Sequence, residues 1–310
     1  MISLFKVNFC SPHTEVDSIK IMGASIFGTS QMNPSHLKQY IEDIRQGLIR
    51  VSDLLPMSGD ESKILYPVPP FPIKSSGSTS RSKRITQGMH RKKKLHYQTI
   101  EKIREMAKFM NEVGIDGDYL SKFEDIPGQV DDFSEYAVSL EELTPKVYVR
   151  ELTQYGPLAI RKINGKDIIA SKTTAFLAEY NNEMFIESMN FLQDRGLSGN
   201  LSRGKGKFIY RQGLAHEQAG FNGPGHYLLL SKFCPSKDDL TSIDFEKSYY
   251  NLNFFYGRTR TGAVLSMVRY IEPGALLYIK NKVNGILAEN PQENGESSPR
   301  HFGAVMVRVI

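Results

Sequence analysis

The stretch from Arg195 to Lys207 carries the strongest chemical signal in the sequence. It reads Arg-Gly-Leu-Ser-Gly-Asn-Leu-Ser-Arg-Gly-Lys-Gly-Lys, with four glycines, four Lys or Arg residues and no acidic residue. Glycines let a backbone approach a ligand closely and present successive N–H groups, which suits an anion. The Ser and Asn side chains can add hydrogen bonds to phosphate or sugar. The composition therefore predicts a loop that grips a phosphate backbone.

Regular elements on both sides of this loop should hold it in place. A helix is expected before it, because apolar and small residues recur at helical spacing and Gly196 stands where a glycine would end the helix. The spaced residues are Met184, Phe185, Ser188, Met189 and Leu192. A strand-like run follows at 207–211. The loop thus connects a helix to a strand, in that order.

Two other interpretations of the loop stay open at this point. The run from Gly199 to Lys205 matches the beginning of a Walker A motif, but the next residue should be Ser or Thr to hold magnesium, and it is Gly206. A Walker loop also runs from strand to helix. The second alternative is a flexible surface turn whose charges are solvated.

The seven histidines make no catalytic or metal-binding pattern. None stands at metal-ligand spacing from another His, a Cys or a carboxylate, and there is no nucleophile elbow or paired-carboxylate motif. His13 is the one candidate general base, because metal-independent ribonucleases can use a histidine near a basic loop. A histidine at the surface or core edge is the commoner outcome. We therefore expect no catalytic residue, no metal and no cofactor.

Composition sets the broad class. The chain has 310 residues, enough for two domains, and its formal net charge of +5 permits a nucleic-acid partner without requiring one. Cys10 and Cys234 stand far apart, which favours reduced thiols and a cytoplasmic protein. No apolar run is long enough for a membrane-spanning helix, so no membrane partner is expected.

The order of the expected elements predicts an α+β fold. An alternating run at Ile2–Phe9 predicts a strand, a helix capped by Asn33 or Ser35 follows, and 49–55 predicts a second strand. Further strands are expected at 146–150 and 174–180, before the helix and strand that flank the glycine loop. This β-α-β…β-α-β order is that of a split ferredoxin-like domain with a large insertion. The helix after the first strand should bury a stripe of residues: Leu37, Tyr40, Ile41, Ile44 and Leu48.

We therefore predict two ferredoxin-like (RRM-like) domains. The first spans 1–212, with an insertion around 74–145 and the glycine loop at 196–207, and the second, smaller one spans 213–310. Strands of the second are expected at 227–230, 263–270, 275–279 and 302–310, and Ser236 with Asp239 makes a capping box before a short helix.

The insertion contains two segments of opposite charge. Residues 74–94 hold eight Lys or Arg and no acidic residue, whereas 112–142 hold ten acidic residues and one lysine. The basic segment is either a solvated disordered loop or an arm that becomes ordered on nucleic acid. Between them, a helical stripe from Ile100 to Val113 predicts a helix.

Taken together, several segments resemble one known family. Ser11-Pro-His13 follows the first strand, Ser25-Ile-Phe-Gly28 stands where relatives show Asp-Thr-Leu-Phe, and Tyr66-Pro-Val-Pro69 stands where they often show Tyr-x-Pro-Lys-Pro. The run from Gly196 to Phe208 is similar to the family's Gly-x-Gly-Gly-x-x-x-x-Gly-x-Gly-x-Phe loop. The chain thus resembles the fourth subunit of Csm complexes, which are type III-A CRISPR effectors. Val68, Leu201 and the Gly199-Asn200 pair depart from the family pattern.

The resemblance implies a RAMP-superfamily RNA-binding subunit that holds the 5′ tag of the guide RNA (crRNA) and has no nuclease activity of its own. The implied partners are the crRNA and target RNA, the large polymerase-like subunit and the backbone RAMP subunit. The expected RNA-binding residues are Gly196, Ser198, Gly199, Asn200, Ser202, Arg203, Gly204, Lys205, Gly206 and Lys207 in the loop, with His13, Ser25, Arg84, Arg91, Lys92 and Lys93 outside it.

Two functions of other classes remain as alternatives. One is a metal-independent RAMP endoribonuclease that processes precursor crRNA, with His13 and a nearby Tyr or Lys as acid and base. The other is a metabolic protein that uses the glycine loop to bind a nucleotide phosphate.

Overall fold

The computed structural model describes residues 2–11, 13, 16–71, 97–113, 137–142, 150–155, 158–197, 205–215, 219–256, 266–288 and 299–310. The basic segment 74–94 lies outside these residues, as does most of the acidic segment. Ten of the expected RNA-binding residues also lie outside: Ser198, Gly199, Asn200, Ser202, Arg203, Gly204, Arg84, Arg91, Lys92 and Lys93.

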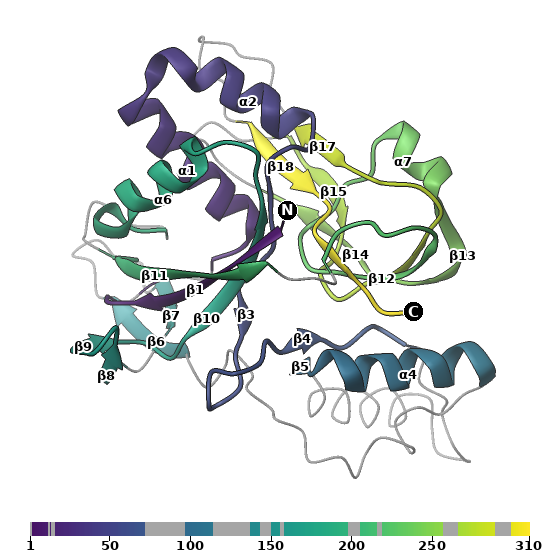
Figure 1. Ribbon diagram of the computed structural model, residues 1–310, viewed down its shortest axis with the longest axis horizontal. Helices are drawn as coiled ribbons and strands as arrows, with labels where there is room; N and C mark the ends of the chain where they lie inside the picture. Colours follow the sequence, from purple (N-terminus) through teal and green to yellow (C-terminus); the bar gives the residue numbers. More distant parts are fainter. Residues whose placement is uncertain are drawn as a thin grey trace.

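A five-stranded antiparallel sheet, here the first sheet, forms one half of the molecule (Figure 1). Its strands are β1 (Ile2–Phe9), β2 (Arg50–Val51), β3 (Leu55–Pro56), β10 (Thr174–Glu179) and β11 (Phe208–Ala215). The order is β11-β1-β10-β2, and β3 also pairs with β10. The strands predicted around β1, β10 and β11 are therefore confirmed.

The single strand predicted over 49–55 is instead two short strands. The interruption falls at Ser52, whose hydroxyl oxygen accepts a hydrogen bond from the Leu177 N–H at 2.9 Å, where a ladder carbonyl would otherwise serve. The next residue, Asp53, donates its N–H to the Leu230 carbonyl of the other half. The chain thus leaves the first sheet briefly between β2 and β3.

Three helices cover one face of the first sheet, as Figure 1 shows: α1 (Ser18–Met32), α2 (Leu37–Arg45) and α6 (Met184–Arg195), with a 3-10 turn η1 (Pro34–His36) before α2. Alternate residues of β1 (Phe5, Val7 and Phe9) point into the core beneath them. Helix α6 and its C-terminal Gly196 are as predicted.

Helix α1 was not predicted as such. The segment from Ser25 to Gly28 was expected to lead towards a helix, but it lies inside α1, which Asp17 caps through a hydrogen bond from the Lys20 N–H. The cap predicted at Asn33 or Ser35 was wrong, because α2 has no side-chain cap of this kind. Leu48, predicted to be buried, follows the turn after α2 and is exposed.

A four-stranded sheet, here the second sheet, forms the other half in the order β13-β16-β12-β19. Its strands are β12 (Gly225–Leu229), β13 (Ile243–Tyr249), β16 (Leu276–Ile279) and β19 (Met306–Arg308), and α7 (Lys237–Ser242) lies between β12 and β13. The predicted capping box at Ser236 and Asp239 is present. The single closing strand predicted over 302–310 is instead β18 (Arg300–Gly303) followed by β19.

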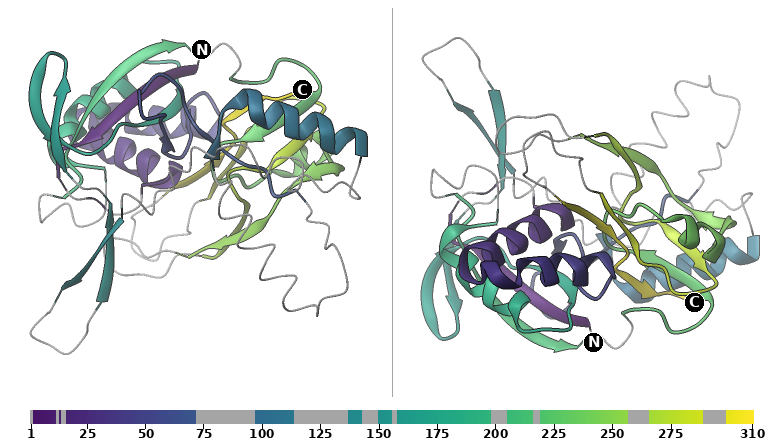
Figure 2. Two further views of the ribbon diagram at one scale, coloured as in Figure 1. Left: turned by 90° about the horizontal axis from the view of Figure 1, so that it is seen from below. Right: turned by 90° about the horizontal axis from the view of Figure 1, so that it is seen from above.

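The remaining strands form two-stranded sheets. These pair β4 (Tyr66–Pro67) with β5 (Tyr97–Gln98), β6 (Ala137–Glu142) with β7 (Arg150–Tyr155), β8 (Ala159–Ile163) with β9 (Lys166–Ala170), β14 (Leu252–Phe255) with β15 (Val268–Ile271), and β17 (Gly285–Ala288) with β18. Figure 2 shows that the β6–β7 hairpin projects away from the rest of the chain.

One apolar core joins the two sheets. Ala175 and Leu177 of the first sheet share it with Leu228 and Leu276 of the second, and helix α4 (Ile100–Val113) packs on the same core through its predicted stripe. Val113, the last residue of that stripe, is exposed. The predicted α+β class is confirmed. Strand β11 runs to Ala215, past the predicted boundary after residue 212, and the division into two domains stays a prediction.

Candidate nucleic-acid interface

The two ends of the glycine loop are tied together, and we call this part (196–197 and 205–207) the loop stem. Gly196 ends α6 with φ +98° and ψ 161°, a conformation that is essentially restricted to glycine. A Cβ at this position would lie 2.6 Å from the Lys205 carbonyl oxygen. The Leu197 N–H donates to the Gly206 carbonyl at 3.0 Å, and the Leu197 side chain is buried. The two ends of the glycine loop therefore form a closed stem.

The loop stem is fastened to the end of β1. The Cys10 N–H donates to the Lys207 carbonyl at 2.7 Å, and the Lys207 N–H donates to the Ser11 hydroxyl at 2.9 Å. The Lys207 side chain is exposed, and that of Lys205 is half-buried. The structure thus places two of the predicted cations together, beside the two glycines Gly196 and Gly206.

Two other predicted RNA contacts lie in the core instead. Ser25 is fully buried within α1, where its hydroxyl donates to the Met22 carbonyl and accepts from the Tyr40 hydroxyl. His13 is 5% exposed, and its ring stacks on Phe9 with 3.6 Å between the ring centroids. Neither side chain can reach an RNA on the surface, because both are buried. We therefore leave Ser25 and His13 out of the candidate site.

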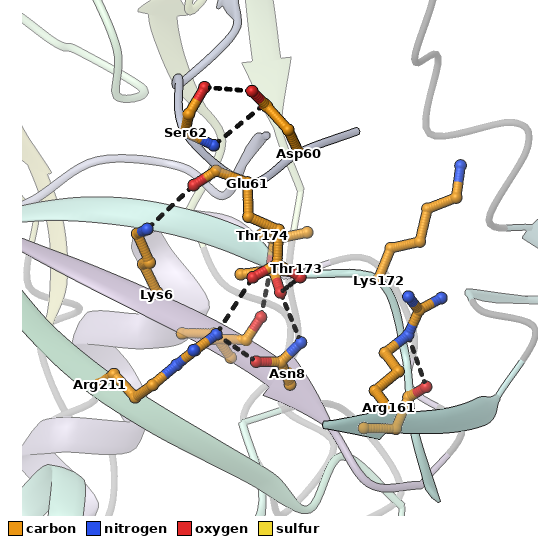
Figure 3. Close-up of polar contacts among 12 residues, drawn as sticks. Lys6, Asn8, Asp60, Glu61, Ser62, Arg161, Lys172, Thr173, Thr174 and Arg211 are labelled. Atoms are coloured by element: carbon orange, nitrogen blue, oxygen red, sulfur yellow. Dashed lines mark hydrogen bonds and ion pairs between the residues drawn. The ribbon is translucent and has the colours of Figure 1, made fainter. Parts of the chain in front are cut away.

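A second group of polar residues lies on the face of the first sheet opposite the helices (Figure 3). Lys6 and Asn8 alternate with the buried phenylalanines of β1, Arg211 comes from β11, and Thr173 precedes β10. We call these four residues the polar sheet face. Sequence reasoning missed them, although the period-two alternation in β1 already put Lys6 and Asn8 on the face away from the phenylalanines.

Hydrogen bonds fix the polar sheet face. The Asn8 amide nitrogen donates to the Thr173 hydroxyl at 2.7 Å and to the Ser171 carbonyl at 3.2 Å, which turns its oxygen towards Arg211 Nη2 at 3.2 Å. Glu61, from the turn at 58–63, contacts three of the four residues. It accepts from Arg211 Nη2 at 3.3 Å and from the Thr173 hydroxyl, and its backbone carbonyl accepts from Lys6 Nζ at 3.0 Å.

The loop stem adjoins the end of the strand pair β1–β11, which carries Lys6, Asn8 and Arg211 of the polar sheet face. Lys6 lies opposite Arg211, and Phe9 lies opposite Phe208, the residue after the stem. Ser171 exchanges hydrogen bonds with Phe9, at 2.8 Å to its carbonyl and at 2.9 Å from its N–H. A polymer with regularly spaced phosphates could therefore contact the loop stem and then follow β1 and β11 along the sheet.

Within the residues described, no group of three or more His, Cys, Asp or Glu side chains could hold a metal ion. None of the helices in the described ranges is long and apolar enough to cross a membrane.

Comparison with solved structures finds chains that match over their full length. A chain from the crystal structure of a Csm1–Csm4 cassette in complex with cA4 is 13% identical, with a TM-score of 0.56, and the match covers 100% of this chain and 98% of that one. A chain from the crystal structure of a Csm3–Csm4 subcomplex of a type III-A CRISPR-Cas interference complex is 15% identical, with a TM-score of 0.57 and coverage of 98% and 99%. This chain has their fold.

Sequence comparison adds nothing to this likeness. No family model matches the chain, and no curated protein has a significantly similar sequence.

Proposed function

We propose that this chain is a Csm4-like, non-catalytic subunit of a type III CRISPR effector complex, in which it holds the 5′ tag of the crRNA. The observation that carries the proposal is the full-length likeness to chains from two different complexes, because Csm4 is the component that both have in common. The other components of these two complexes suggest the protein partners of this chain: a large subunit of the Csm1 kind and a backbone subunit of the Csm3 kind.

The sheet orders support two ferredoxin-like domains of the RAMP type. Numbered within each half, the strands of both sheets lie in the order fourth, first, third, second: β11-β1-β10-β2 in the first and β19-β12-β16-β13 in the second. In the first half, helices fill both crossovers, as expected of the split β-α-β pattern. In the second, α7 fills one crossover and the β17–β18 hairpin stands in the other.

The loop stem supports an RNA backbone as the ligand. Its glycines and its exposed Lys207 lie at one end of the first sheet, and the part of the loop between them adds Ser, Asn and Arg residues in the sequence. Backbone N–H groups and basic side chains of this kind contact phosphates without reading bases. Single-stranded RNA also offers unstacked bases that neighbouring side chains can contact.

The structure gives no support to His13 as the base of an endoribonuclease. A general base must lie within hydrogen-bond reach of the proton that it removes. His13 is almost completely covered and packs against Phe9. We therefore assign cutting of RNA, if the assembled complex performs it, to other subunits.

The direct test is RNA binding by a variant with Lys205→Ala and Lys207→Ala. We expect weaker binding of the crRNA, and a slope of log affinity against log salt reduced by about 0.7 for each lost phosphate contact. Lys38→Ala with Lys237→Ala is the matched control, because it removes the same charge from exposed positions on α2 and α7. If the test and control variants have equal slopes of log affinity against log salt, the loop stem is not part of the RNA site.

A further inference from the structure

Two cations of the polar sheet face lie directly opposite each other. Lys6 on β1 is in register with Arg211 on β11, so both side chains project from the same face. Like charges in this position repel unless an anion lies between them. Glu61 supplies that anion, but of the two cations its carboxylate contacts Arg211 alone, whereas Lys6 is bound by the backbone carbonyl of Glu61. One carboxylate thus lies beside two cations and neutralises one of them, so positive charge remains in excess.

The hydrogen bonding of Arg211 is incomplete. Its Nη2 is shared between Asn8 and Glu61, at 3.2 and 3.3 Å, both longer than the 2.7–2.9 Å usual for a charge-assisted bond. Its Nε is buried and has no partner among the described residues. Nε and Nη2 form one edge of a guanidinium, and two oxygens of a phosphate can accept from that edge together. The Glu61 carboxylate uses only half of it.

Glu61 is held in this position by a strained turn. Its φ is +56°, a value that few residues other than glycine adopt and that occurs most often at functional sites. The turn itself is fastened by Asp60, whose carboxylate accepts from the hydroxyls of Ser58 and Ser62. These hydrogen bonds occupy Asp60 within the turn, so Glu61 is the carboxylate presented to the sheet (Figure 3).

Both members of the ion pair can be reached from solvent. The side chains of Arg211 and Glu61 are 30% and 38% exposed. An exposed pair with one long contact is weak, and salt screens it. A phosphodiester that offers two oxygens to Arg211 and charge to Lys6 would satisfy both cations better than Glu61 does.

We propose that the polar sheet face is a phosphate-binding subsite for single-stranded RNA, and that Glu61 occupies it as a resident anion which a phosphodiester displaces. The inference deepens the proposed function and rests on it, because it gives the same RNA a second contact beyond the loop stem. Asn8 and Thr173 position the Arg211 guanidinium in this subsite, and Arg211 and Lys6 carry the charge.

The test compares Glu61→Gln and Arg211→Gln, two variants at opposite ends of one ion pair. The probe is a fluorescently labelled poly(U) strand, bound to the full-length protein over a range of salt. We expect Arg211→Gln to weaken binding and to reduce the salt slope by roughly 0.7. We expect Glu61→Gln to tighten binding by up to about fivefold, since the phosphate no longer has to replace a carboxylate. Opposite signs would support the subsite, because loss of a merely structural ion pair would affect both variants in the same direction.

An ion pair on α2, away from the polar sheet face, provides the control. Glu42 and Arg45 form an ion pair on the helix-covered side of the first sheet, so Glu42→Gln and Arg45→Gln change net charge equally and should leave affinity unchanged. Arg211→Lys keeps the charge but loses the two-donor edge, so it should weaken binding without reducing the slope.

Two results would overturn the phosphate subsite but leave the proposed function standing. The first is weaker RNA binding by Glu61→Gln. The second is normal binding by both Glu61→Gln and Arg211→Gln while the Lys205→Ala, Lys207→Ala protein binds weakly. If that loop variant also binds normally, the proposed function fails as well.

Discussion

Gly196 has a backbone conformation that other residues avoid. A neighbouring carbonyl oxygen also leaves no room for a Cβ at this position. Its φ of +98° and ψ of 161° cost about 1–3 kcal/mol for a residue with a Cβ, and the added Cβ would meet the Lys205 carbonyl oxygen at 2.6 Å. We expect Gly196→Ala to lower the free energy of unfolding by at least that amount, as measured by urea denaturation. Gly23→Ala is the control: nothing lies within 4 Å of its Cβ, so it should be neutral or stabilise α1 by about 0.5–1 kcal/mol. Similar values for both variants would show that the stem is not closed as described.

His301 should make the fold sensitive to acid. Burial, followed by the charge of Arg50, lowers the pKa of His301 to about 3. An unfolded histidine has a pKa near 6.5, so the contribution of His301 is complete above that pH and is lost as pH falls towards 3. We expect His301→Gln to flatten the fall in unfolding free energy between about pH 6 and 4. Parallel curves for the two proteins would mean that His301 is accessible to protons in the fold.

At the scale of elements, α4 is the piece that closes the core between the sheets. Its Met106 is completely buried, and it belongs to the core that residues of both halves share. We expect Met106→Ala to reduce the free energy of unfolding by about 2–5 kcal/mol, because the cavity is lined by residues that cannot all move in. Lys108→Ala, at an exposed position of the same helix, should change it by less than about 0.5 kcal/mol. A small loss of unfolding free energy in Met106→Ala would contradict the packing of α4 on the shared core.

The sequence allowed the elements around the loop to be predicted well. The period-two run of β1 and the helical spacing before Gly196 are strong local signals, and β1, α6 and β11 lie where they were expected. Helix α1 was missed because its glycines and hydroxyl residues weaken that signal. Gly28 is there for packing, since a Cβ on it would lie 3.0 Å from the Cβ of Ser188 on α6. Such a close contact between helices distant in the sequence cannot be predicted from a local sequence pattern.

The candidate site was only half predictable for the same reason. The glycines and cations of the loop stem are adjacent in the sequence, so composition was sufficient to find them. Ser25 was included by resemblance alone, and only the packed structure shows that Tyr40 covers it. Glu61 and Arg211 are far apart in the chain and meet only because a turn brings one over the strand of the other.

At the scale of the whole molecule, a buried charge cluster joins the halves. Lys232 of the second half binds Asp17, and Asp53 lies beside them with its carboxylate accepting from the Ser18 N–H at 2.8 Å. Burial and then the charge of Asp17 raise the pKa of Asp53 to about 6, although Lys232 opposes this. The folded state therefore holds this proton more tightly than the unfolded chain does.

The sign of that shift gives a prediction. Stability from a carboxyl whose pKa is raised is greatest below its unfolded value, near 3.9, and is lost as pH rises through about 6. We expect Asp53→Asn, which can still accept from Ser18, to become more stable relative to the wild type as pH rises from about 4 to 7. The check is the free energy of unfolding of the wild type and of Asp53→Asn, measured across this pH range. A constant difference between the two proteins would refute a raised pKa of Asp53.

Crosslinking within the assembled complex tests the central claim, that this chain holds the 5′ tag of the crRNA. The chain would be assembled with its large and backbone subunits on two crRNAs, one with a photoreactive nucleotide in the 5′ tag and one with it near the 3′ end. We predict that the tag probe crosslinks to this chain, with adducts at 196–207, and that the 3′ probe does not. Crosslinks from the 3′ end, or tag crosslinks confined to other subunits of an intact complex, would contradict the account.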